Sequence, residues 1–353
     1  MQPLNGMRRL VAPVVMSLAF VAGPHAFATG SGCPSDVDGD GRVSAQDLAL
    51  LLADWGGSPH GSAATDIDGN GIVDAADLSI MLGAWDTCVA VPAWAELVEA
   101  KPDPAVVGSA ALRAAIEQSG LAWRVRDRVA GIELLLVPEG AFMMGATPDD
   151  TLAFSDEYPA HAVAFAQPFY LGRYEVMQRE FEAVMGFNPS YFPQSSLGGD
   201  ADYPVETVSH DTIAGFLDAT GLRLPTEAEW ECACRAGTTA PNYAELGQTL
   251  DGIAWYGPNS GYITHLVGMK PANALGFHDM LGNVWEWVAD WYDAGYYAVS
   301  PLASPQGPEW GIFRVIRGGS WYTPESNTRA PFRGAMWPAA ELGDTGFRVA
   351  RSP

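Results

Sequence analysis

Basic residues are scarce in this chain: 19 Lys and Arg stand against 42 Asp and Glu among 353 residues, a formal net charge of −23. A surface of this sign repels phosphate backbones and anionic lipids, so nucleic acid is not an expected partner. Beyond the N-terminal segment, no apolar run approaches the roughly 18 residues that a membrane-spanning helix needs. The sequence therefore predicts no membrane span in the mature protein.

Signals of several common enzyme classes are also missing. The chain has no G-x-S-x-G elbow, no Walker loop and no dinucleotide-binding fingerprint. Its six histidines show no H-x-x-x-H spacing that would suggest a metal cluster: His25, His60, His161, His210, His265 and His278. These absences give no support to a serine hydrolase, a nucleotide-binding enzyme or a histidine-ligated metalloenzyme.

The N-terminus is typical of an export signal. Arg8 and Arg9 precede an apolar run over 10–23, and an A-x-A site follows at 26–28. We therefore predict a signal peptide over 1–28, cleavage near Ala28 and a secreted or cell-surface location, where disulfides persist. The alternative is a buried N-terminal helix.

A repeat with a 30-residue period follows the predicted cleavage site. Two loops of the form D-x-[DN]-x-[DN]-G begin at Asp36 and Asp66, and each leads into a short amphipathic pattern. Gly41 and Gly71 permit the sharp turn at position six, and position twelve is acidic. The candidate calcium ligands are Asp36, Asp38, Asp40, Arg42 (carbonyl) and Asp47, then Asp66, Asp68, Asn70, Ile72 (carbonyl) and Asp77, with Ser44 and Asp74 at position nine.

The charge of this segment favours bound calcium. Residues 33–88 carry ten carboxylates against one arginine. Two Ca²⁺ ions would offset four of these charges, so we expect folding to be coupled to calcium. The alternative is an acidic loop repeat without metal.

Over 33–88 the sequence resembles the type I dockerin module, a small all-α unit of two EF-hand-like loop-helix repeats. The resemblance implies two calcium ions and a cohesin partner, bound chiefly through positions ten and eleven of each loop. Those positions hold Ala45, Gln46, Ala75 and Ala76. Cys33 and Cys88 stand at the two ends of the module, and we predict a disulfide between them, contributing roughly 4 kcal/mol in the chain-entropy model.

The rest of the chain mixes short helical and strand patterns. Residues 89–131 are interpreted as a linker with a helix over 104–118. Ser209 is the expected N-cap of a helix ending at Thr220, and Thr226 opens a capping box for the next helix. Strands are expected at 313–316 and 347–349. The sequence thus predicts an irregular, loop-rich α+β domain over 132–351.

This domain resembles the formylglycine-generating enzyme (sulfatase-modifying factor) family. Seven pieces of the family's pattern occur in order: 137–145, 174–176, 204–209, 223–231, 281–287, 317–321 and 346–349. The resemblance implies a relative of the C-type-lectin fold with bound calcium. One calcium is expected on Asp279, Glu286 and the carbonyls of Gly282 and Val284; the alternative is that the two carboxylates are capping or salt-bridged groups.

The family's chemistry is the oxidation of a sulfatase cysteine to formylglycine with O₂ and Cu(I) held by two cysteines. Here Thr323 and Thr328 occupy those positions. A neutral hydroxyl is a hard, weak ligand for a soft ion, so we do not expect copper. Cys232 and Cys234, two apart in a helical pattern, point to different faces and are interpreted as packed or free thiols.

Two functions therefore compete. The first is a calcium-bound recognition domain that the dockerin docks on a cohesin-bearing, polysaccharide-associated scaffold or surface; its ligand is an unidentified glycan, peptide or protein. The second is a formylglycine-generating oxidase with an unrecognised thiol or metal, and a purely structural surface protein is a third. The expected pocket residues are Trp285, Ser320 and Trp321, and the expected ligand face is Tyr322, Asn327, Arg329 and Arg333, unless the arginines are solvated or form structural pairs.

Overall fold

The computed structural model describes residues 33–38, 43–57, 63–85, 89–192, 202–244 and 249–353. The predicted signal peptide and three predicted site residues, Asp40, Arg42 and Cys88, lie outside these ranges. In the part of the chain that is described, no helix combines the length and apolar character needed to cross a bilayer.

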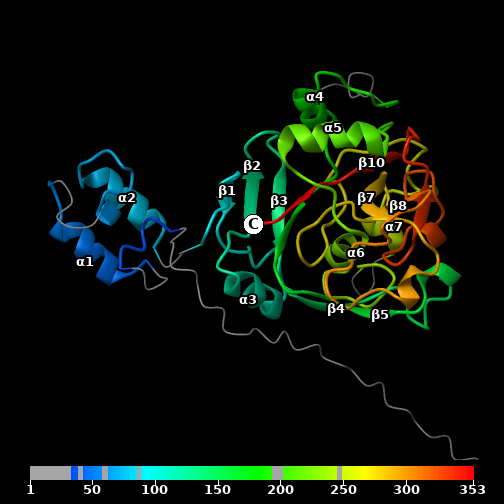
Figure 1. The fold of residues 1–353 in the computed structure, drawn as a ribbon, viewed down its shortest axis with the longest axis horizontal. Coiled ribbons are helices and arrows are strands. Elements are labelled where there is room, and N and C mark those ends of the chain that lie inside the picture. The colour runs from blue at the N-terminus through cyan, green and yellow to red at the C-terminus, as the bar shows by residue number, and fades with distance from the viewer. Residues whose placement is uncertain (1–32, 39–42, 58–62, 86–88, 193–201, 245–248) are drawn as a thin grey trace, which may run out of the picture.

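The dockerin-like segment consists of two loop-helix repeats, with helices α1 (Ala45–Ala53) and α2 (Ala75–Gly83) (Figure 1). Ser44 and Asp74 cap these helices in matching capping boxes, each closed by the aspartate at position twelve of the loop. A small core of its own holds the repeats together: Cys33, Val43, Leu51, Val73 and Met81. Cys33 is disulfide-bonded, whereas Cys232 and Cys234 are free.

The C-terminal domain begins earlier than predicted. Its five-stranded sheet has the order β1-β2-β3-β6-β11, and β1 and β2 come from the predicted linker. Helix α3 (Ala110–Gln118) of the same segment begins after its cap Ser109, later than predicted, and buries Leu112 and Ile116 in the domain core. The linker interpretation is therefore wrong for this stretch. The strands are β1 (Ala95–Glu99), β2 (Arg124–Asp127), β3 (Glu133–Val137), β6 (Phe169–Gly172) and β11 (Ala350–Arg351).

Two further sheets complete the domain. In the four-stranded sheet β10-β7-β8-β9, β10 runs parallel to β7, pairing Thr345 with Trp285, while the other pairs are antiparallel. The strands are β4 (Gly140–Met144), β5 (His161–Phe165), β7 (Trp285–Trp291), β8 (Arg314–Arg317), β9 (Gly334–Met336) and β10 (Thr345–Phe347), with β4 and β5 forming the third sheet. The remaining helices are α4 (Gln178–Met185), α5 (His210–Thr220), α6 (Glu227–Arg235) and α7 (Leu250–Ile253).

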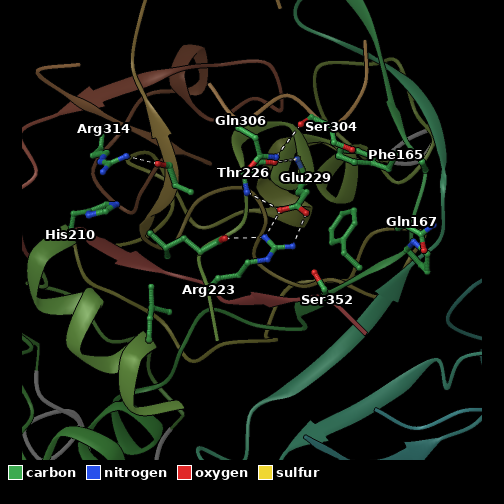
Figure 2. Close-up of a pocket in the computed structure, with 16 residues that line it drawn as sticks. Phe165, Gln167, His210, Arg223, Thr226, Glu229, Ser304, Gln306, Arg314 and Ser352 are labelled. Atoms are coloured by element: carbon green, nitrogen blue, oxygen red, sulfur yellow. Dashed lines mark hydrogen bonds and ion pairs between the residues drawn. The ribbon is translucent and has the colours of Figure 1, made fainter. Parts of the chain in front are cut away.

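The predicted helix signals are confirmed at α5 and α6. Ser209 accepts a hydrogen bond from Thr212, and α5 ends at Gly221 in the left-handed conformation. Thr226 and Glu229 form the capping box of α6, and Glu229 also pairs with Arg223 at 2.6 Å (Figure 2). The strand predicted over 347–349 is interrupted between β10 and β11.

Candidate functional site

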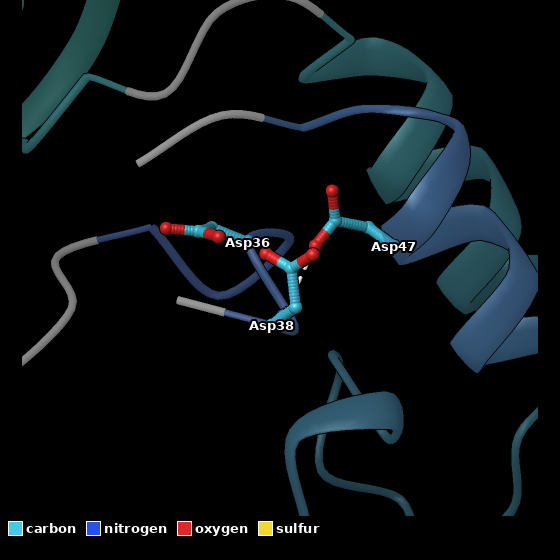
Figure 3. Close-up of side chains that lie close together, drawn as sticks. All are labelled: Asp36, Asp38 and Asp47. Carbon is cyan, nitrogen blue, oxygen red and sulfur yellow. Dashed lines mark hydrogen bonds between the residues drawn. The ribbon is translucent and has the colours of Figure 1, made fainter. Parts of the chain in front are cut away.

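The two dockerin loops bring carboxylates together as the calcium prediction requires. In each loop, oxygens from positions one, three and twelve lie within 4.8 Å of one another: Asp36, Asp38 and Asp47 (Figure 3), and Asp66, Asp68 and Asp77. The position-twelve aspartates are buried and organise the loops. Asp47 Oδ1 accepts the amides of Val37 at 2.7 Å and Asp38 at 3.1 Å, and Asp77 repeats this geometry with Ile67 and Asp68 at the same distances.

The second loop also contains an oxygen available to a cation. Asp66 Oδ2 accepts the Gly71 amide at 2.8 Å, while its Oδ1 is buried and has no hydrogen-bond partner among the described residues. A buried unbonded carboxylate oxygen is costly without a cation, so the loop fits Ca²⁺. Asn70 Oδ1 accepts the Ile72 amide at 2.9 Å within the same loop.

Thr323 and Thr328 meet in the structure. Both side chains are buried, and their Oγ1 atoms lie 3.3 Å apart. Thr323 donates to Ser320 O at 3.0 Å and accepts from Ser320 N at 2.9 Å, while Thr328 donates to Pro324 O at 3.1 Å. Neutral hydroxyls already bonded to neighbouring backbone do not fit Cu(I), which prefers thiolates.

The free cysteines do not supply the missing thiolates. Burial raises the pKa of Cys232 to about 12 and also raises that of Cys234. Both sit on α6, and Asn273 bonds the carbonyls of Ala233 and Cys234. They are packed thiols, in agreement with the prediction.

Next to the threonine pair lies a chain of aromatic rings, which we call the aromatic strip. It runs Tyr191, Phe192, Trp321, Tyr322, Tyr262, with successive ring centroids 4.9, 5.4, 5.5 and 6.0 Å apart. Tyr191, Tyr322 and Tyr262 are 73%, 64% and 61% exposed. Only Trp321 and Tyr322 were predicted, because the other three lie far from the 317–321 piece in sequence and join the strip through tertiary structure.

Hydrogen bonds with buried groups hold the aromatic strip in position. The carboxylate of Glu206 is fully buried and accepts the amides of Tyr191 at 2.9 Å and Phe192 at 2.8 Å. Trp321 donates from its ring nitrogen to Gly343 O at 3.0 Å, and its carbonyl accepts from Ser260 at 2.6 Å. The strip is therefore held in place before any ligand arrives.

Tyr262 carries backbone strain. Its φ of 63° lies in the left-handed region, which is costly for a bulky side chain. The Ser260 hydroxyl accepts the Tyr262 amide at 3.1 Å and so holds the turn. The strain keeps an exposed ring beside Tyr322.

Two arginines of the predicted ligand face are structural instead. Arg329 is buried and binds Glu157 and Asp150, each at 2.6 Å. Arg333 is buried and donates two hydrogen bonds to the Glu227 carboxylate, at 2.7 and 2.9 Å. The prediction that both face a ligand is wrong, since each neutralises carboxylates inside the domain. Asn327 is half-buried, whereas Tyr322 remains on the surface.

The other predicted pocket residues are also buried. Trp285 packs against Phe332 with ring centroids 5.6 Å apart, while Trp287 of the same strand, which was not a predicted pocket residue, donates from its ring nitrogen to Val208 O. Ser320 donates to Asp344 at 2.9 Å. These side chains therefore lie beneath the surface, while Trp321 contributes to the aromatic strip.

The predicted C-terminal calcium residues lie in a buried acidic cluster. Glu286 binds Arg348 at 2.7 and 2.8 Å and accepts from Trp230 at 2.7 Å, so the salt-bridge alternative describes this carboxylate. Asp279 accepts the Gly268 amide at 2.6 Å, and burial raises its pKa to about 6. Glu175 is a third buried carboxylate. Burial raises its pKa, and the charges of Asp279 and Glu286 raise it further.

Comparison with known proteins follows the division seen in the fold. Residues 124–353 match the sulfatase-modifying factor enzyme 1-like domain, and residues 34–83 match the dockerin type I domain. The chain therefore belongs to the sulfatase-modifying factor family and carries a dockerin before that domain.

Named relatives cover the C-terminal part. The serine/threonine-protein kinase pkn1 of Chlamydia caviae is 32% identical over 241 residues, 62% of this chain but 38% of that protein. The formylglycine-generating enzyme of Thermomonospora curvata is 30% identical over 289 residues, 62% of this chain and 93% of the enzyme. The structure of PvdO from Pseudomonas aeruginosa aligns with a TM-score of 0.58 and 30% identity, covering 65% of this chain and 98% of PvdO.

Proposed function

We propose that the C-terminal domain recognises an extended ligand, a glycan or a peptide, along the aromatic strip. The single observation that supports this most strongly is the unbroken row of five rings, three of them more than 60% exposed. Single exposed aromatic rings are common, but a contiguous row of them is typical of an interaction site. Rigid tyrosine and tryptophan side chains give a large contact area at a low entropy cost.

The dockerin would place this domain on a partner. Its first helical turns expose Ala45, Gln46, Ala75 and Ala76, the positions at which dockerins contact cohesins. We infer that calcium on the two loops orders these turns, because Asp47 and Asp77 join each loop to its helix. Such an arrangement serves a secreted protein displayed on a cohesin-bearing scaffold or surface.

A third calcium ion belongs to the proposal. In the acidic cluster, three buried carboxylates face one guanidinium, that of Arg348. A divalent cation on Asp279, Glu286 and the carbonyls of Gly282 and Val284 would offset the remaining charge. Its role would be structural, since the cluster lies inside the domain.

Oxidase activity is the second candidate, which 30% identity to a formylglycine-generating enzyme over most of that enzyme's length leaves open. The threonine pair is the specific observation against it. No thiolate stands at that position, and the two cysteines of α6 are packed with raised pKa values.

Binding to combined glycan and peptide arrays, in calcium, tests the recognition proposal. Tyr322→Ala and Tyr262→Ala should each lower binding about tenfold or more, as expected for an exposed aromatic anchor. Trp310→Ala is the matched control, because Trp310 is 80% exposed and lies outside the aromatic strip. Blank arrays with folded protein, or equal losses from all three variants, would reject the proposal.

A further inference from the structure

A second concave site lies away from the aromatic strip, between β6, α5, α6, β7 and β8. It is a cavity of about 620 Å³, a size typical of small-molecule sites. Figure 2 shows Arg314 and His210 at one end, Phe165 and Gln167 at the other, and the Arg223–Glu229 pair between them. Its walls therefore come from segments spread over most of the domain.

The charges that line this cavity do not cancel. Arg223 and Glu229 neutralise each other through two hydrogen bonds at 2.6 and 2.7 Å. Arg314 forms no ion pair with any described residue; it stacks on Trp291 at 3.6 Å and donates from Nη1 to Ala289 O at 2.5 Å. The carboxylates that act on it at longer range, Asp290 and Asp211, do not line the cavity. One positive charge is left at this end.

Two buried nitrogens at the same end lack partners. Arg314 Nε and His210 Nε2 are buried and make no hydrogen bond to the described residues. Each such group normally costs stability and needs an explanation. Burial and the nearby Arg314 lower the pKa of His210 to about 4, so its ring is neutral at pH 7 and offers one donor or acceptor.

The rest of the lining, the amide-and-hydroxyl wall, is largely polar and uncharged. It presents amides and hydroxyls from Gln167, Gln306, Ser304 and Ser352, together with the rings of Phe165 and Phe169. Such a wall suits hydroxyl groups, which both donate and accept hydrogen bonds. A purely apolar ligand would leave these groups unsatisfied.

We propose that this cavity binds a small hydroxylated carboxylate, of the sugar-acid type, with the carboxylate on Arg314 and the hydroxyls on the amide-and-hydroxyl wall. A single carboxylate balances the one guanidinium that lacks an ion pair and can accept from the N–H groups that Arg314 presents to the cavity. The planar fork of arginine matches carboxylate geometry. This site is separate from the ligand surface of the proposed function.

The test is an NMR titration of the full chain, in calcium at pH 7, with D-glucuronate, D-glucose and inorganic phosphate as probes. Glucuronate should bind about tenfold tighter than glucose, the loss expected for one charge-assisted contact. Shifts should appear at the amides of Ala289 and Arg314. Equal affinity for glucose, tighter binding of phosphate, or no binding of glucuronate would each overturn the proposal.

Amino-acid substitutions test whether glucuronate binds in this cavity. Arg314→Gln should weaken glucuronate binding about tenfold. Arg128→Gln is the matched control, since Arg128 also donates to one backbone carbonyl, that of Ala95, but lies elsewhere. Ser352→Glu adds a negative charge from the exposed C-terminal tail and should also weaken binding without disturbing the core.

Tyr322→Ala should leave glucuronate binding unchanged, which separates failure of this site from failure of the aromatic strip. If Arg314→Gln and Ser352→Glu both bind like wild type, the assignment of the carboxylate to this cavity is wrong.

Discussion

In the dockerin, Asp47 and Asp77 are buried with backbone amides around them, and Arg42 is the only basic residue over 33–88. In the C-terminal domain, buried carboxylates instead meet buried arginines: Arg317 lies on Glu227 and Glu231, and Arg329 on Glu157. An external cation would stabilise the first arrangement, whereas in the second the arginines supply the positive charge. Stability should therefore depend on calcium mainly in the dockerin and on side-chain pairs in the C-terminal domain.

Calcium removal should have the largest effect. With a chelator, repulsion among the loop carboxylates should unfold the dockerin, and the signals of α1 and α2 should disappear from NMR spectra. The C-terminal domain should stay folded and keep most of its near-UV circular dichroism even without the proposed third ion, because it has a hydrophobic core of its own and Arg348 already pairs with Glu286. Helical dockerin signals that persist in chelator would contradict the comparison.

Arg317→Met should cost about 3–5 kcal/mol of C-terminal stability, because it removes one guanidinium partner from each of two buried carboxylates. Arg317 is fully buried between Glu227 at 3.2 Å and Glu231 at 2.5 Å. The control Arg126→Met removes a half-exposed partner of Glu133 and should cost no more than about 1 kcal/mol. Urea denaturation, followed through the unfolding transition of the C-terminal domain, measures the loss of stability in both variants. Equal losses would refute the role given to Arg317.

Asp47→Ala and Asp77→Ala should lower dockerin stability in calcium by similar amounts, about 1–3 kcal/mol, through unsatisfied amides and a lost ligand. The equality follows from the matched distances in the two loops, 2.7 and 3.1 Å in each. Thermal melting of each variant over a series of calcium concentrations compares the two losses of stability. A large effect in one loop only would show that the repeats are not equivalent.

The last effect, the smallest when counted per pH unit, is the pH dependence of stability. Burial, and secondarily Glu227, raise the pKa of Asp290 from 3.8 to about 8. The folded state then keeps Asp290 protonated, whereas the unfolded state releases that proton. The contribution of Asp290 to the free energy of unfolding is therefore fully present below about pH 4 and is lost as the pH rises through 8. The slope is at most about 1.4 kcal/mol per pH unit. Asp290→Asn should flatten the slope between pH 5 and 8; an unchanged slope would assign it to other groups.

The sequence predicted the features that depend on local spacing. The dockerin loops, the caps at Ser209 and Thr226, and the family's ordered pieces all rest on residues close together in the chain. These signals were enough to define the fold and the loop carboxylates, because helix caps and calcium loops are closed by contacts within about a dozen residues.

Features that depend on distant contacts were missed. Arg329 meets Glu157 across 172 residues, so its burial has no local signal. Strands β1 and β2 joined a sheet whose other members lie beyond residue 132, and their segment was taken for a linker. The aromatic strip likewise assembles Tyr191, Tyr262 and Tyr322 from three separate loops.

Metal analysis of the purified full chain, after equilibration with both Ca²⁺ and Cu(I), tests the central claim most directly. The account predicts at least two calcium ions per chain and no stoichiometric copper, because Thr323 and Thr328 offer only bonded hydroxyls. The double variant Thr323→Cys/Thr328→Cys should gain copper in the same assay. One Cu(I) per wild-type chain, with conversion of a cysteine-containing C-x-P-x-R peptide to aldehyde, would contradict the account.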